Sequence, residues 1–338
     1  SYIIYIKHLK GAIQMIGDMQ KWTPNVAGII EHAREIHPKT EIISRLVSGE
    51  IHRSNYEKVC IRSRKLASAL EKDGVKKGDV IATLALNTYR HLEMYYGISG
   101  MGAITHTLNF RLHPEQAVYI INHAEDKIIF VELPFVPILE ALQENLKTVE
   151  KYVVLCEVDE MPETALKNAI SYEEYIQDGD ENYSWPTLED DAACALCYTS
   201  GTTGNPKGVL YSHKSNVIHA QAALTAMTIK PDDTILMVVP LFHVLAWGIP
   251  YFGPMNGLKL VMPGMQMEGE PLFELIDQED VTLAFGVPTI WMGLLAYCRD
   301  NNKILSSVKN TIIGGSALSL ATLQEFDEVH DVNVIHAW

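Results

Sequence analysis

Short apolar runs and segments with helical spacing alternate along the first half of the chain. Three mainly apolar runs have the length of β-strands: residues 80–86, 127–131 and 152–158. Apolar residues recur at helical spacing in four segments: residues 25–36, 56–72, 114–124 and 136–146. Asn87 or Thr88 can cap a further helix that runs to about Met101. Strands without a polar side are typical of parallel sheets with helices on both faces, so we predict a doubly wound α/β unit.

The second half repeats this alternation after an acidic segment. Residues 178–181 and 189–191 are rich in Asp and Glu, and we interpret them as a solvated linker rather than a metal site. Strand-length apolar runs then return at residues 234–239, 258–262, 281–285, 311–313 and 332–335. We therefore divide the chain into linear halves, 15–190 and 191–338, and expect the second unit to begin with the glycine-rich segment after Cys197.

Composition excludes several classes of protein. With 338 residues, 47% of them hydrophobic, the chain can build a large core without disulfides. The net charge of −15 argues against nucleic acid or an anionic membrane as the main partner, because phosphate backbones require clustered lysine and arginine. The five cysteines are odd in number and scattered, which favours free thiols and a cytoplasmic location. We interpret Cys194 and Cys197 as core residues.

The start of the chain and its longest apolar tract give no targeting or membrane signal. Residues 1–14 contain a short apolar run followed by basic residues instead of a cleavage site, so we interpret them as an extension. The apolar tract at 235–263 is interrupted by Pro240, His243 and Pro250, which argues against a transmembrane helix. We expect this tract to be buried core.

The most informative stretch is the glycine- and hydroxyl-rich segment at 198–208. Glycines let backbone N–H groups converge on an anion, hydroxyls add donors, and Lys207 neutralises charge, so we predict a polyphosphate cradle. It is not a Walker loop, because Pro206 stands where that motif needs glycine and Gly208 where it needs a metal-binding Ser or Thr. A plain surface turn is the alternative interpretation.

Residues 198–208 read YTSGTTGNPKG and resemble the signature of the adenylate-forming superfamily, which includes acyl-CoA ligases, peptide-synthetase adenylation domains and luciferases. Weaker similarities lie at residues 52–57 and 100–109. The resemblance implies an α/β fold of two stacked doubly wound sheets covered by helices (αβαβα), with the chain crossing between two interleaved subdomains. It also implies activation of a carboxylic acid to an acyl-adenylate with ATP and Mg²⁺, followed by thioester formation with coenzyme A.

The same resemblance implies roles for individual residues. The phosphate donors are expected to be Thr199, Ser200, Gly201, Thr202, Thr203 and Gly204. Lys207 is expected to pair with the polyphosphate, and His243 to lie at the junction of the phosphate and acyl sites. From the residues alone, a single histidine on an apolar face is more typical of a core. Trp247, Val287, Pro288 and Gly315 are expected to border the acyl group. Gly314, Gly315, Ser316, Ala317 and Trp338 are expected to contact the nucleotide.

Residues 106–109 and 122–126 are similar to bacterial medium- and long-chain fatty acyl-CoA ligases and to methylmercaptopropionate-CoA ligases, which favours an aliphatic acid. Ligases of short-chain or aryl acids and a non-catalytic nucleotide- or acyl-binding scaffold remain alternatives. The family's Thr-Glu motif for phosphate and Mg²⁺, its ribose-binding aspartate and its C-terminal lysine are not found before the end at Trp338. We therefore expect an incomplete N-terminal domain without its own metal ligands, inactive by itself, whose exposed sheet edge favours a homodimer.

Overall fold

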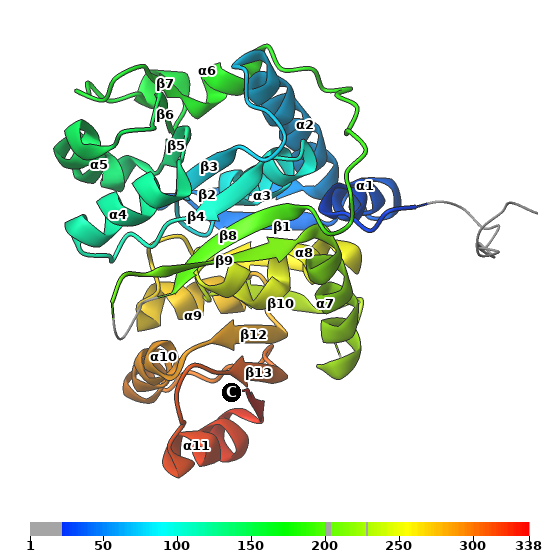
Figure 1. Cartoon of the computed structure of the whole chain (residues 1–338). Coiled ribbons are helices and arrows are strands. Elements are labelled where there is room, and N and C mark those ends of the chain that lie inside the picture. Colours follow the sequence, from blue (N-terminus) through cyan, green and yellow to red (C-terminus); the bar gives the residue numbers. More distant parts are fainter. Residues whose placement is uncertain (1–21, 200–203, 228, 338) are drawn as a thin grey trace, which may run out of the picture.

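The computed structural model describes residues 22–199, 204–227 and 229–337 (Figure 1). Several predictions from the sequence lie outside the described residues. These are the extension at 1–14, the phosphate donors Ser200, Gly201, Thr202 and Thr203, and the nucleotide contact at Trp338.

Two seven-stranded sheets organise the described chain. The first has the order β7-β6-β5-β3-β4-β8-β9. Its strands are β3 (Val80–Leu84), β4 (Ile104–Thr107), β5 (Ile128–Val131), β6 (Lys151–Val154), β7 (Ala169–Ser171), β8 (Ala193–Thr199) and β9 (Lys207–Ser212). All of its neighbouring pairs are parallel except β8 with β9.

The second sheet has the order β14-β13-β12-β10-β11-β1-β2 and is parallel except for the pair of β1 with β2. Its strands are β1 (Glu41–Arg45), β2 (Ile51–Asn55), β10 (Thr234–Met237), β11 (Lys259–Met262), β12 (Leu283–Gly286), β13 (Asn310–Ile313) and β14 (Asn333–His336). Both sheets are therefore mixed, with the antiparallel pair at one edge.

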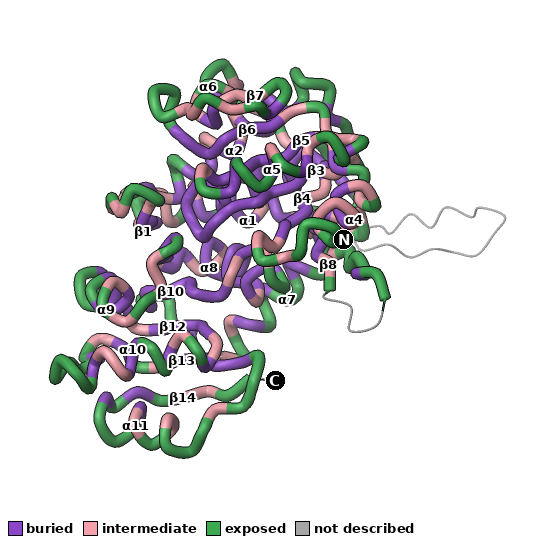
Figure 2. Tube along the Cα trace, turned by 90° about the vertical axis from the view of Figure 1, so that its left-hand side faces the viewer, coloured by how far each residue is buried: buried purple, intermediate pink, exposed green. Residues whose placement is uncertain are grey.

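Helices separate and cover the two sheets in five layers, as expected (Figures 1 and 2). Helices α4 (Pro114–Ala124) and α5 (Val136–Leu142) cover the outer face of the first sheet. Helices α2 (Tyr56–Lys72), α3 (Tyr89–Gly100) and α6 (Tyr172–Gln177) cover its other face. Helices α1 (Val26–Ile36), α7 (His213–Ala226) and α8 (Ile249–Met255) pack between the sheets. Helices α9 (Gly269–Gln278), α10 (Pro288–Asn301) and α11 (Leu320–His330) cover the outer face of the second sheet.

Side-chain alternation explains why the strands are apolar throughout. In β10, Ile235 and Met237 face the core between the sheets, while Leu236 faces the core under α9 and α10. Successive residues of this strand therefore enter two different cores, and both of its faces bury apolar side chains. Figure 2 shows the buried trace concentrated along these strands.

The structure corrects the linear division of the chain. The sequence analysis assigned the glycine-rich segment to the second unit, but β8 and β9, which flank it, belong to the first sheet. Strands β1 and β2, near the start of the chain, belong to the second sheet and were not predicted. Strand pairing across such distances depends on tertiary contacts that a local pattern does not contain.

Several element boundaries also differ from the sequence predictions. The strand expected at 152–158 ends at Val154, because Glu157 and Glu160 form a capping box around a short 3₁₀ turn. The helix expected at 136–146 ends at Leu142. The helices expected at 56–72 and 114–124 are confirmed.

The segment expected to be a solvated linker is anchored to the first unit. The Trp185 ring packs on Gly100 of α3, where an added Cβ would lie 2.6 Å from it, and the Trp185 indole donates a 2.6 Å hydrogen bond to Glu31. Asp190 forms a 2.7 Å ion pair with Lys214. The segment is therefore anchored at Trp185 and Asp190, while its acidic residues are exposed or half-exposed, as expected for a solvated linker. Within the described residues, no group of three or more His, Cys, Asp or Glu side chains could hold a metal ion.

Asn87 connects the two units. Its carboxamide nitrogen donates 2.8 Å hydrogen bonds to the carbonyls of Met237 and Val239, and its oxygen accepts a 2.8 Å hydrogen bond from the backbone of Leu241. The side chain is buried. The N-cap of α3 is Thr88, whose side chain makes no capping bond. Asn87 therefore does not cap a helix. It holds residues 237–241, where the chain leaves β10.

We predict that Asn87→Ala lowers the free energy of unfolding by about 3 kcal/mol, because three buried backbone groups lose their partners. Urea denaturation of the parent and the variant measures this. The matched control is Asn182→Ala, which removes an exposed carboxamide and should leave the midpoint nearly unchanged. Equal midpoints for the two variants would contradict the role assigned to Asn87.

A second prediction concerns His91, which is buried in α3. Its Nδ1 lies 3.0 Å from the Leu86 carbonyl, so Nδ1 donates, and Nε2 accepts from the Thr83 hydroxyl at 3.0 Å. Burial lowers the pKa of His91 from 6.5 to about 4. As the pH falls, the unfolded state therefore binds a proton before the folded state does. The free energy of unfolding is highest above pH 6.5 and should decrease by on the order of 3 kcal/mol as the pH falls toward 4.

Unfolding free energies at pH 7 and pH 5 test this. His91→Gln replaces the imidazole with an amide that does not titrate, so the decrease between the two pH values should be smaller in this variant than in the parent. An identical pH dependence would indicate that His91 is not responsible.

Candidate nucleotide and carboxylate site

Strands of both sheets end at one common region. Thr107 ends β4 and Thr199 ends β8 in the first sheet, while residues 242–247 follow β10 in the second. Val287 directly follows β12, and Gly314 follows β13. Carboxyl ends of parallel strands are where open α/β sheets bind ligands, so this is the candidate site.

The glycine-rich segment connects two antiparallel strands. Thr199 at the end of β8 is paired with Lys207 at the start of β9, and the Thr199 hydroxyl donates a 3.4 Å hydrogen bond to the Lys207 carbonyl. Helix α7 begins at His213, after β9. Gly204 has a φ of +96°, a conformation that favours glycine, and both Gly204 and Lys207 are exposed.

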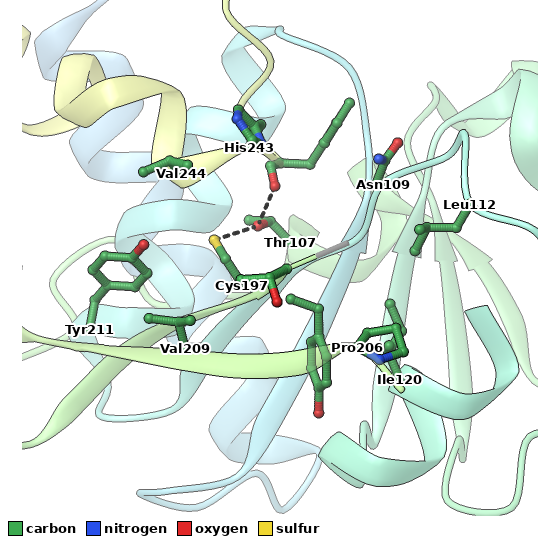
Figure 3. Close-up of a pocket in the computed structure, with 13 residues that line it drawn as sticks. Thr107, Asn109, Leu112, Ile120, Cys197, Pro206, Val209, Tyr211, His243 and Val244 are labelled. Carbon is green, nitrogen blue, oxygen red and sulfur yellow. Dashed lines mark hydrogen bonds between the residues drawn. The ribbon is translucent and has the colours of Figure 1, made fainter. Parts of the chain in front are cut away.

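A first pocket of about 190 Å³ lies beside this hairpin (Figure 3). We call it the hairpin pocket. Its walls come from β4, β8, β9 and the segment after β10. The residues that line it are Thr107, Asn109, Leu112, Ile120, Cys197, Tyr198, Thr199, Pro206, Val209, Tyr211, Phe242, His243 and Val244. It therefore brings the start and the end of the glycine-rich segment next to His243.

A second pocket of about 380 Å³ lies on the other side of His243. We call it the apolar pocket, because aliphatic and aromatic side chains form most of its lining. The residues are His219, Met227, His243, Val244, Trp247, Phe285, Val287, Ile312, Gly314, Gly315 and Ala337. His243 and Val244 line both pockets, so they form the boundary between them.

The turn that carries these residues has an unusual backbone. Val244, Leu245, Ala246 and Trp247 have φ values of +45°, +51°, +47° and +56°, and Gly248 follows at +84°. Left-handed conformations cost roughly 1–2 kcal/mol per residue outside glycine. The side chains of Leu245 and Ala246 are buried in the core between the sheets, and this packing offsets the cost. Nothing in the sequence signals this left-handed turn.

Close packing explains the glycine at the rim of the apolar pocket. A Cβ at Gly314 would lie 3.0 Å from the Trp247 ring and 3.1 Å from the Ala337 carbonyl. Glycine therefore lets the Trp247 indole lie directly on the β13 backbone. The contact fixes one wall of the apolar pocket.

A buried polar group lies below Tyr198. His106 Nδ1 is 2.8 Å from Asp126, and both side chains are fully buried. Burial raises the pKa of Asp126, and the neighbouring His106 opposes this. The Tyr198 hydroxyl donates to His123 Nδ1 at 2.6 Å, or accepts from it, and burial raises the pKa of Tyr198 to about 12. These contacts hold the strand that enters the glycine-rich segment.

The structure brings together most of the described residues that the sequence analysis assigned to the acyl side. His243, Trp247, Val287 and Gly315 share the apolar pocket, and Gly314, which was assigned to the nucleotide, lines it too. Pro288 is buried at the start of α10 and does not line it. Ser316 and Ala317 are exposed and line neither pocket, and the Ser316 carbonyl accepts a 3.2 Å hydrogen bond from His336 Nε2.

Sequence reasoning missed several lining residues. Phe285 and Ile312 could have been found, because both point to the inner face by strand alternation. Thr107, Cys197 and His219 gave no signal, since an isolated threonine, cysteine or histidine has no distinguishing pattern. Cys194 and Cys197 are buried free cysteines, as predicted.

Solved structures share this fold. The chain superposes on the anthranilate CoA ligase AuaEII in complex with anthranoyl-AMP with a TM-score of 0.84 and 22% identity, covering 93% of this chain and 60% of that one. For the long-chain-fatty-acid-CoA ligase FadD1 from Archaeoglobus fulgidus, the TM-score is 0.81 at 23% identity, covering 95% of this chain and 65% of that one. The architecture is that of adenylate-forming enzymes, which confirms the predicted fold class.

The chain belongs to the AMP-binding enzyme family, whose profile matches residues 30–338. It is 44% identical to a medium-chain-fatty-acid–CoA ligase of Ectopseudomonas oleovorans and 43% identical to a 3-methylmercaptopropionyl-CoA ligase of Ruegeria pomeroyi, covering 96% of this chain and 60% of each relative. A long-chain-fatty-acid–CoA ligase of Thermus thermophilus is 39% identical, over 90% of this chain and 55% of the relative. The chain thus spans 55 to 60% of the length of these relatives.

Proposed function

We propose that the protein carrying this chain is an acid–thiol ligase that activates an aliphatic carboxylic acid with ATP and transfers the acyl group to coenzyme A. One observation carries the proposal: His243 separates a pocket beside the glycine-rich hairpin from an apolar pocket. Nucleotide phosphates beside the hairpin and an acyl chain in the apolar pocket would meet at this residue. The family and its fatty-acid-CoA ligase relatives support the same reaction.

In this proposal, Thr199, Gly204 and Lys207 hold the phosphates, with residues 200–203 completing the loop. Lys207 supplies charge, and the hydroxyl and backbone N–H groups supply directed hydrogen bonds. His243 orients the carboxylate for attack on the α-phosphorus, where positioning accounts for much of the rate. Gly314 and Gly315 let a flat ligand approach β13, and Trp247 and Val287 form the acyl wall.

Mg²⁺ is expected to accompany the nucleotide. Within the described residues, no cluster of His, Cys, Asp or Glu fits a metal ion, so we assign no step of the reaction to a residue that binds it. Coenzyme A and the acid are small-molecule partners. The described residues contain no helix with the length and hydropathy to span a bilayer.

The acid is proposed to be a medium- or long-chain fatty acid. A short thioether acid is the second candidate, because the 3-methylmercaptopropionyl-CoA ligase is nearly as similar as the medium-chain ligase, at 43% against 44% identity. ATP–pyrophosphate exchange with short, medium, long and thioether acids tests both. Absence of exchange with every acid would favour a non-catalytic nucleotide- or acyl-binding role.

Three further features are proposals. We propose that residues 1–14 are an extension and that the remainder forms two interleaved subdomains, one around each sheet. A cytoplasmic location is supported by the five free, buried cysteines. A homodimer is proposed because β14 lies at a sheet edge within the described residues.

We predict that Lys207→Ala weakens ATP use by about 10- to 100-fold and leaves acid binding largely unchanged, because it removes one charge-assisted phosphate contact. Titration with an ATP analogue measures the effect. The control is Lys167→Ala, which removes an exposed lysine near the opposite edge of the first sheet. Equal analogue affinity in both variants would refute the role of Lys207.

We predict that Trp247→Ala shifts the preference among acid chain lengths while the Michaelis constant for ATP changes little, because the indole forms a wall of the apolar pocket. Specificity constants for a series of saturated acids measure the shift. Trp185→Ala is the control, since Trp185 is also half-buried but packs on α3. An altered ATP dependence with an unchanged acid profile would place Trp247 elsewhere.

A further inference from the structure

Thr107 and Cys197, both on the first sheet, form a hydrogen-bonded link to the segment that follows β10 of the second sheet. They are paired neighbours on β4 and β8. The Thr107 hydroxyl donates a 3.3 Å hydrogen bond to the Phe242 carbonyl, and its oxygen lies 3.4 Å from the Cys197 sulfur (Figure 3). Because the single hydroxyl hydrogen goes to Phe242, the thiol must donate to Thr107. Cys197 therefore donates to Thr107, and Thr107 donates to the carbonyl of Phe242, the residue directly before His243.

The same thiol faces the left-handed turn. Burial raises the pKa of the Cys197 thiol, and the nearby backbone of Leu245 and Val244 opposes this. Cys197 and Val244 line the same hairpin pocket, while Thr107 holds the Phe242 carbonyl just before the turn. A raised pKa makes the thiol a poor nucleophile, so its contribution is through contacts rather than covalent chemistry.

The strained backbone needs such contacts. Four consecutive non-glycine residues, from Val244 to Trp247, have positive φ. A conformation of this kind persists only where its surroundings determine it. The turn exposes Val244 while burying Leu245 and Ala246, and it places His243 at the boundary of both pockets.

We propose that Thr107 and Cys197 are positioning residues that hold the left-handed turn and thereby set His243 relative to the glycine-rich hairpin. This proposal rests on the proposed function, because the reaction that His243 serves is itself proposed. Cys197 lies on the strand that enters the hairpin at Thr199, so a shift of that strand moves the support of His243. The link therefore couples the nucleotide side of the site to the carboxylate side.

Hydrogen exchange of the 338-residue chain tests the link without any assay of activity. In Thr107→Val, amides of residues 243–248 should exchange on the order of tenfold faster than in the parent, because the turn loses its support. Thr105→Val is the matched control. Thr105 lies on the same strand, is equally buried and bonds Ser99 at 2.9 Å, away from the turn. Equal protection of 243–248 in both variants would overturn the proposal.

Conservative and complementary variants separate positioning from packing. Thr107→Ser keeps the hydroxyl and should restore the protection lost in Thr107→Val. Cys197→Ser keeps a donor at the same place, whereas Cys197→Ala removes it and should expose the same amides. Parent-like protection in Thr107→Val together with a loss of protection in Thr107→Ser would show that the methyl group matters and not the hydroxyl, which contradicts the link.

Kinetics of the full-length protein then test the consequence for the reaction. Thr107→Val should lower kcat for ATP–pyrophosphate exchange about tenfold with little change in the Michaelis constant for ATP, and Thr107→Ser should recover most of it. A parent without exchange would refute the proposed function, while hydrogen exchange still decides whether the link exists. An active parent with equal kcat in Thr107→Val and Thr105→Val would overturn the positioning role.

Discussion

The carboxamide of Asn87 satisfies three backbone groups at once, and the path of the chain between the sheets depends on it. Its partners at Met237, Val239 and Leu241 belong to the segment that leaves β10 and reaches His243. Backbone groups in this buried position have no access to water, so the segment could not take this route without them being paired. Residues that directly follow this segment line both pockets, so the shape of the pockets depends on where Asn87 holds the chain.

Neither sheet builds the candidate site by itself. The first sheet supplies Thr107 and the hairpin of β8 and β9, while the second supplies the turn with His243 and the ends of β12 and β13. The buried core between the sheets contains residues of α1, α3, α7 and α8 and is continuous. A dense core of this kind holds the two sheets at a fixed position relative to each other, because packed interiors deform little.

Local sequence patterns predicted most helices and the buried strands, because apolar periodicity and strand length depend on local residues. Membership of β1, β2, β8 and β9 in their sheets could not be predicted, since pairing over such distances leaves no local trace. At the site, His243, Trp247 and Gly314, which the resemblance singled out, line one pocket, and their roles stay predictions. The left-handed turn and the contacts of Thr107 and Cys197 were beyond prediction, because they arise from tertiary packing around ordinary residues.

The hairpin that frames the glycine-rich segment has a consequence for how an anion would be held. A loop that opens a helix binds phosphate partly through the field of aligned peptide dipoles, but β8 and β9 run in opposite directions, and strand dipoles largely cancel. With α7 beginning only after β9, the described end of the loop supplies one full charge, that of Lys207. The exposed charge of Lys207 is screened by dissolved ions. The affinity for a nucleotide should therefore fall as the ionic strength rises, and phosphate products should dissociate readily.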